Sequence, residues 1–131
     1  MAKWERWSVN KEVPAKLELQ ALIDDKDGLK LVFTDADENI YTFLFDGLVF
    51  SYRNTDEGTL LKTLDHLYKH YDTDYFGEWT LFRVTDSNYL EWLAEEADNI
   101  YEKIYNIHHY VFLTSHDVVE VLSTEPPSLI S

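Results

Sequence analysis

The chain of 131 residues has no cysteine, four glycines and three prolines. Without cysteine it can form neither disulfide bonds nor thiolate zinc sites, and it is compatible with a reducing compartment. So few glycines leave little material for a phosphate-binding loop, and neither G-x-S-x-G nor H-E-x-x-H occurs in the sequence. The best-known motifs of nucleotide binding, serine hydrolysis and zinc proteolysis are therefore absent.

Long apolar runs are also missing. No stretch approaches the roughly 18 to 20 apolar residues that a membrane-spanning helix needs. Residues 1–9, MAKWERWSV, have no apolar core of the kind that a signal peptide carries. We therefore expect a cytoplasmic protein with no membrane partner.

Basic residues are scarce. The chain carries 11 lysines and arginines against 25 aspartates and glutamates, a formal net charge of −14. Such a surface repels phosphate backbones and anionic lipids, so we expect no nucleic-acid partner. From Asp86 onward there are nine acidic residues and a single base, Lys103. This acidic end has two interpretations, simple solubility or a surface that steers a basic protein partner.

What is present is enough apolar material for one core. Hydrophobic residues make up 45% and aromatic residues 15% of the chain, which predicts a single domain over residues 1–131. Its most informative stretch is 77–97. Residues 79–84 are aromatic and β-branched like a buried strand, 85–88 supply helix-capping side chains, and 90–97 place Leu and Ala at helical spacing. The stretch therefore predicts a strand followed directly by a helix.

The first half of the chain predicts strands at residues 17–23, 29–34, 40–45 and 48–53. The acidic cluster at 24–28 ends in glycine, which is typical of a hairpin turn. Asp46-Gly47 separates the third strand from the fourth and favours a type I′ turn with positive φ at both residues. We therefore expect a four-stranded antiparallel meander, preceded by a helix or an arm that lays Trp4 and Trp7 on the domain.

The second half predicts helices and one or two further strands. Residues 60–71 follow helical spacing, with Asn54 or Thr55 as the cap. A strand at 108–113 precedes capping residues 114–117 and a short helix at 118–122. The helix that follows Ser87 ends either at Asp98-Asn99 or near Glu102. The expected fold class is α+β, a mainly antiparallel sheet packed by about three helices.

Two groups of residues resemble metal sites. Asp35, Asp37, Asn39 and Asp46 occupy positions 1, 3, 5 and 12 of a calcium loop, but Ile40 stands where that loop needs glycine. An aspartate-rich hairpin turn is the favoured interpretation.

His66 and His70 are four residues apart on one helix and could share a metal, yet no third ligand accompanies them, so a solvated face is favoured. We expect no metal, no cofactor, no catalytic residue and no enzymatic activity. Arg53 and Arg83 have two open interpretations, a structural ion pair or a contact to an anion or a partner.

Resemblance to a known family rests on three segments: FSYRNTDEGTLLKTLDHLYKHY (50–71), WTLFRVTDSNYLEWLAEEA (79–97) and HHYVFLTSHDVVEVLSTEPP (108–127). They resemble small, poorly characterised proteins of Gram-positive bacteria. Members of that group are similar to immunity proteins, which protect a cell from its own polymorphic secreted toxins. The resemblance implies inhibition by binding, and it identifies no functional residue.

A candidate binding site comes from charge spacing alone. In a helix from Ser87 to about Glu102, acidic residues at i, i+4, i+7 and i+11 form one stripe beside a buried side that includes Tyr101. The expected partner-binding residues are Glu91, Glu95, Glu96, Asp98 and Glu102.

The stripe suits a basic partner such as a secreted nuclease toxin, which an acidic protein-binding module of the immunity type would neutralise. The alternatives are a housekeeping adaptor or structural interaction domain, and a small-ligand binder or enzyme with an aromatic pocket.

Overall fold

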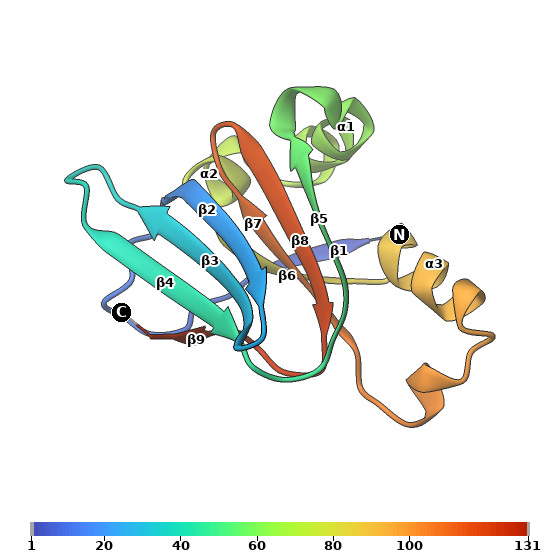
Figure 1. Ribbon diagram of the computed structural model, residues 1–131. Coiled ribbons are helices and arrows are strands. Elements are labelled where there is room, and N and C mark those ends of the chain that lie inside the picture. Colours follow the sequence, from blue (N-terminus) through green and yellow to red (C-terminus); the bar gives the residue numbers. More distant parts are fainter. Residues whose placement is uncertain (1, 131) are drawn as a thin grey trace.

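A computed structural model describes residues 2–130 of the chain. It is an α+β structure of two antiparallel sheets and three α-helices (Figure 1). None of the helices in the described residues is long and apolar enough to cross a membrane.

The smaller sheet has four strands in the order β2-β3-β4-β9. Their bounds are β2 (Glu18–Asp25), β3 (Gly28–Thr34), β4 (Ile40–Phe45) and β9 (Ser128–Leu129). The predicted hairpin between β2 and β3 is confirmed, with Asp25 paired to Gly28. Gly28 has φ of 120°, and a Cβ there would lie 2.9 Å from the carbonyl oxygen of Phe45. Glycine is therefore required at this turn both by its backbone conformation and by the closeness of β4.

The larger sheet has five strands in the order β1-β6-β7-β8-β5, and all of its pairings are antiparallel. Their bounds are β1 (Lys3–Arg6), β6 (Leu81–Thr85), β7 (His108–Leu113), β8 (Asp117–Ser123) and β5 (Val49–Asp56). The arm that carries Trp4 and Trp7 is confirmed, because β1 adds to the edge of β6. Trp4 packs edge to face on Phe82, and Trp7 packs on Tyr110.

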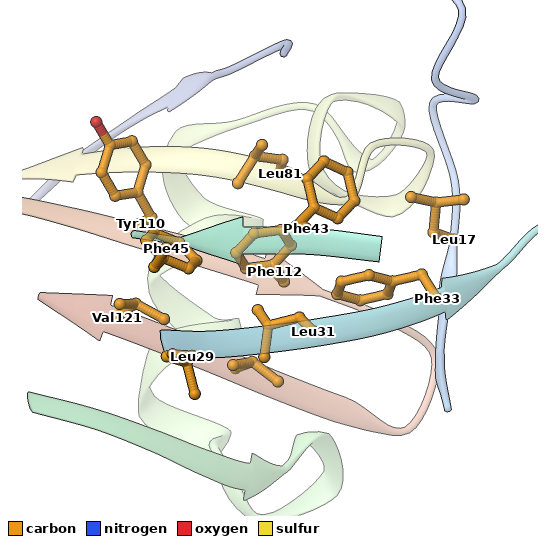
Figure 2. Packing of buried hydrophobic residues seen from close by; sticks show 11 residues of the cluster. Leu17, Leu29, Leu31, Phe33, Phe43, Phe45, Leu81, Tyr110, Phe112 and Val121 are labelled. Atoms are coloured by element: carbon orange, nitrogen blue, oxygen red, sulfur yellow. The ribbon is translucent and has the colours of Figure 1, made fainter. Parts of the chain in front are cut away.

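The main core lies between the two sheets (Figure 2). Alternate residues of β3 and β4 face it, and Phe33 and Phe43 meet the ring of Phe112 from β7 at centroid distances of 5.2 and 5.6 Å. All three phenylalanines are at most 1% exposed. Alternation along β7 sends its other side chains to the opposite face of the larger sheet.

That opposite face is covered by helices. The helices are α1 (Leu61–His70), α2 (Thr73–Gly77) and α3 (Asn88–Glu96), with 3-10 turns η1 (Glu57–Thr59) and η2 (Tyr101–Lys103). Leu67 of α1 and Phe76 of α2 pack with Phe82 and Val111 in a second core. Tyr89 of α3 meets His109 of β7 edge to face at 5.4 Å. The larger sheet is therefore buried on both faces.

The predicted meander is wrong at its fourth strand. β5 pairs with β8 in the larger sheet, and β4 pairs with β9 instead. A type I′ turn needs positive φ at both Asp46 and Gly47. Neither residue has a positive φ, and Gly28 is the only glycine of the described residues that does, so Asp46-Gly47 is not a type I′ turn. Gly47 is fixed by crowding, since its Cβ would lie 2.8 Å from Cγ of Glu125. Here the chain passes from one sheet to the other.

The predicted helix at 118–122 is also wrong, because these residues belong to β8. The two-sided burial of the larger sheet makes every residue from Val118 to Ser123 buried, which removes the alternation that marks a strand. The predicted cap of the first helix is wrong as well. Asn54 and Thr55 lie in β5, and the Asp56 carboxylate caps η1 by accepting the N–H of Gly58 at 2.9 Å.

Candidate binding surface and adjoining cleft

The helix that carries the predicted acidic stripe begins at Ser87, as expected. The Ser87 hydroxyl caps α3 by accepting the N–H of Leu90 at 3.2 Å. The helix ends at Glu96, because Asp98 and Asn99 both have positive φ, 52° and 59°. A single helix to Glu102 is therefore wrong, and the alternative end at Asp98-Asn99 is confirmed.

This ending changes the geometry of the predicted site. Glu91 and Glu95 remain i and i+4 neighbours on α3, whereas Asp98 lies in the turn and Glu102 lies in η2. All five predicted carboxylates, including that of Glu96, are exposed. None of them forms an ion pair with any described residue. They lie along one segment at the side of the molecule, away from the four-stranded sheet (Figure 1).

Large apolar side chains are exposed on the same segment. Five of the exposed large apolar residues of the described chain come from this short stretch. Their exposed fractions are 47% for Trp92, 55% for Ile100, 45% for Tyr101, 66% for Ile104 and 38% for Tyr105. The Tyr101 and Tyr105 rings lie 5.5 and 5.7 Å from the ring of Phe50 on β5. The expectation that Tyr101 lies on a buried helix side is wrong, because the helix stops before reaching it. We call these five residues and the five carboxylates the α3 surface.

A hollow of about 210 Å³ opens within the α3 surface. Leu90, Leu93 and Ala94 of α3 form one wall, and Tyr101 and Tyr105 form the other. Glu102 lines it as well. The hollow could therefore receive an apolar or a long cationic side chain with a carboxylate close to it.

A second hollow is the cleft between α1 and α3, which has a volume of about 350 Å³. His66 and Lys62 of α1 line one side, and residues 86–89 with Glu91 line the other. The strands of the larger sheet contribute Arg53, His109 and Glu120. We call it the α1–α3 cleft.

A chain of polar contacts lines the α1–α3 cleft. Ser87 Oγ lies 2.8 Å from His109 Nδ1, and His109 Nε2 lies 2.9 Å from Glu120 Oε1. Arg53 donates to both carboxylate oxygens, at 2.5 Å from Nε and 3.0 Å from Nη2. Its guanidinium also stacks 4.0 Å from the centroid of the Tyr89 ring. Ser87, His109 and Glu120 are 4%, 3% and 6% exposed.

The charge state of Glu120 follows from these contacts. Burial acts to raise the pKa of Glu120, but the hydrogen bonds and charges of His109 and Arg53 outweigh it and leave the pKa below the ordinary value. An ionised carboxylate can only accept, so Nε2 of His109 carries a proton. When the imidazole is neutral, Nδ1 is an acceptor and the Ser87 hydroxyl donates to it. Ser87, His109 and Glu120 therefore all have hydrogen-bond partners, as buried polar side chains require.

Both arginines form ion pairs. Arg53 pairs with Glu120, and Arg83 pairs with Glu5 at 3.3 Å. Arg83 also lies over the ring of Trp7, 5.3 Å from its centroid. The ion-pair interpretation is confirmed for both, and Arg53 additionally lines the α1–α3 cleft.

The two resemblances to metal sites have ordinary explanations. The Asp35 carboxylate accepts the N–H groups of Asp37 and Asn39, each at 2.9 Å, which is the aspartate-rich turn that the sequence favoured. His66 and His70 have ring centroids 4.7 Å apart, and His66 Nε2 lies 3.0 Å from the carbonyl oxygen of Ala2. No group of three His, Asp or Glu residues within 2–130 could hold a metal ion.

Comparison of the chain with protein-family models, with curated proteins and with solved structures found no match.

Proposed function

We propose that this protein is a binding module that inhibits a basic partner protein through the α3 surface. One observation carries the proposal: five unpaired carboxylates and five exposed large apolar side chains lie on a single segment. Exposed apolar side chains grouped together with charged ones are typical of protein interfaces. The resemblance to immunity proteins supports a secreted toxin, such as a nuclease, as the partner.

The energetics of α3 support binding rather than stability as the reason for its charges. Glu91 and Glu95 repel each other at a cost of a few tenths of a kcal/mol. Glu95 and Glu96 occupy the last turn, where the helix dipole disfavours negative charge, and no basic residue lies in that turn. A cationic partner surface would reverse both penalties. The free protein is therefore slightly destabilised by groups that a basic partner would satisfy.

The apolar and acidic parts of the surface have different effects on binding. Burial of Tyr101, Tyr105 and Ile104 would supply affinity, whereas the carboxylates would speed the encounter with a basic partner. The same carboxylates disfavour a second copy of this acidic chain, which would bring like charges together. A basic protein is therefore a better partner for the α3 surface than a second copy of this chain.

Affinity capture from a lysate of the source organism tests this proposal. The bait variant changes Glu91, Glu95 and Glu102 to Gln. A matched control changes Glu12 and Glu78 to Gln and Asp37 to Asn, three exposed carboxylates on other parts of the molecule. We expect a basic protein to be retained at low salt by the unaltered chain and by the control, and to be lost with the α3 variant.

Raising the salt concentration should release the partner, because the attraction is screened. A partner held equally by all three baits at both salt concentrations would contradict the proposal. Such a result would favour an adaptor that binds elsewhere on the protein.

A further inference from the structure

The Ser87, His109 and Glu120 side chains meet in the α1–α3 cleft, although they come from three separate parts of the chain. We propose that Ser87 is a nucleophile activated by His109, and that the cleft hydrolyses small esters. The cleft borders the α3 surface at Glu91, but the proposed activity does not require the partner proposed for that surface.

The contacts assign a role to each group. Ser87 Oγ lies 2.8 Å from His109 Nδ1, which can accept the hydroxyl proton when the imidazole is neutral, and Glu120 Oε1 lies 2.9 Å from the opposite ring nitrogen. A serine bound to an imidazole that a carboxylate orients is the arrangement that activates a hydroxyl for acyl transfer. Arg53 fixes the carboxylate through two hydrogen bonds. Ser87 and His109 are the catalytic residues of the proposed reaction, and Glu120 and Arg53 are positioning residues.

The backbone around Ser87 also fits a nucleophile. Ser87 lies at a sharp turn between β6 and α3, where Asp86 has φ of 54°. The N–H groups of Asn88 and Tyr89 belong to the first turn of α3 and have no carbonyl partner within the helix. Both residues line the cleft beside Ser87. We assign these two backbone N–H groups to stabilise the oxyanion that forms when the ester carbonyl is attacked.

The lining of the cleft limits the substrate class. A volume of about 350 Å³ suits a small molecule. Trp4, Leu60, Val84 and Val118 give the cleft an apolar part, where a short acyl chain would lie. The rest of the lining carries both signs of charge, Asp86 and Glu91 on one hand and Lys62 and Arg53 on the other, so it does not single out a charged substrate. The cleft is therefore suited to a neutral ester of a short-chain carboxylic acid.

The reaction needs only water as a second reactant. Ser87 Oγ attacks the ester carbonyl carbon while its proton passes to His109 Nδ1. The bond from the acyl carbon to the alcohol oxygen breaks, and the alcohol leaves with that proton. Water then attacks the acyl-serine, giving a proton to His109, which returns it to Ser87 Oγ as the carboxylic acid is released.

The test uses a fluorophosphonate probe, which forms a covalent bond with activated serines. The labelled protein is digested and the modified residue is mapped by mass spectrometry. We expect a single label on Ser87 of the folded, unaltered chain. The position of the label therefore shows whether Ser87 is an activated serine, and this measurement needs no variant.

Variants separate catalysis from helix capping. Ser87→Asn keeps a good capping side chain and removes the nucleophile, so labelling and hydrolysis of p-nitrophenyl butyrate should fall to background. His109→Gln should slow both the labelling and the ester hydrolysis at least about 100-fold. Ser8→Asn, at an exposed serine, should change neither.

Two outcomes would overturn the proposal. The first is a folded, unaltered chain that carries no label on Ser87 after overnight exposure to excess probe. The second is a rate of p-nitrophenyl butyrate hydrolysis that is the same for the unaltered chain and for folded Ser87→Asn. In either case the polar chain would serve only to anchor the start of α3.

Discussion

The guanidinium of Arg53 lies against the carboxylate of Glu120, its direct register partner on the neighbouring strand, with Nη2 3.0 Å from Oε1. The two residues differ in exposure, since the side chain of Glu120 is 8% exposed and that of Arg53 is 50% exposed. The buried carboxylate therefore depends on a cation that reaches in from the surface. This pair, with His109, fixes the face of the larger sheet that lies between α1 and α3.

Changing Glu120 to Gln should lower the free energy of unfolding at neutral pH by about 1 to 3 kcal/mol, because hydrogen bonds to a charged group are lost. The effect should depend on pH. The pKa of Glu120 is below its ordinary value, so its stabilising effect is complete above the carboxylate pKa of the unfolded chain, about 4.3. It is lost as the pH falls through the lower pKa of the folded protein.

Urea unfolding of both chains between pH 7 and pH 3 measures this dependence. The difference between the unaltered chain and Glu120→Gln should shrink as the medium becomes acidic. A difference that stays constant over this range would show that the Glu120 carboxylate is not held in its ionised form.

Changing Gly47 to Ala should destabilise the protein by about 1 to 3 kcal/mol, because the new Cβ would overlap Glu125 and lie 3.3 Å from Oγ1 of Thr124. Gly58→Ala is the matched control, since the nearest atom to its Cβ would be 3.5 Å away. That control should alter stability by less than about 0.5 kcal/mol. Thermal unfolding of the two variants compares them directly, and equal effects would contradict the packing of residues 124 and 125 against Gly47.

Chelation should leave the thermal unfolding curve unchanged. No described cluster offers three metal-ligating side chains, and His66 contacts the backbone of Ala2. The measurement is differential scanning fluorimetry with and without EDTA. A decrease of several degrees that zinc or calcium restores would reveal a ligand set that the structure does not account for.

Changing Tyr101 and Tyr105 together to Ser should have little effect on folding, because both rings are exposed and contact mainly each other and Phe50. Binding should respond differently. Loss of two aromatic contacts from the α3 surface should speed dissociation of the captured partner at least about tenfold. Surface plasmon resonance measures the dissociation rate, and an unchanged rate would place the contact elsewhere.

Local patterns predicted much of the fold. The strand at 79–84, the capping role of Ser87 and the hairpin at 24–28 each depend on neighbouring residues alone, and each is confirmed in kind. Sheet membership depends on distant residues. The sequence predicts the strand at 48–53, but the pairing of β5 with β8 joins segments about 70 residues apart, which the local Asp46-Gly47 signal cannot reveal.

The candidate sites likewise combine features that neighbouring residues predict with features that depend on distant residues. Exposure of the acidic residues follows from their charge, and Asp98-Asn99 was the local signal that ended α3 and left Tyr101 exposed. The contact of Ser87 with His109 and Glu120 depends on which strands are neighbours. The signal for it was a single acid within an apolar run, Glu120 in Val-Val-Glu-Val-Leu, because a buried carboxylate requires partners.

The most direct test of binding through the α3 surface is the association rate constant of the captured partner at several ionic strengths. We expect association with the unaltered chain and with the Glu12, Asp37, Glu78 control to be fast at low salt and to slow steeply as salt is added. The variant with Glu91, Glu95 and Glu102 changed to Gln should associate more slowly and depend less on salt. Equal rate constants and equal salt dependence for all three chains would contradict the proposed interface.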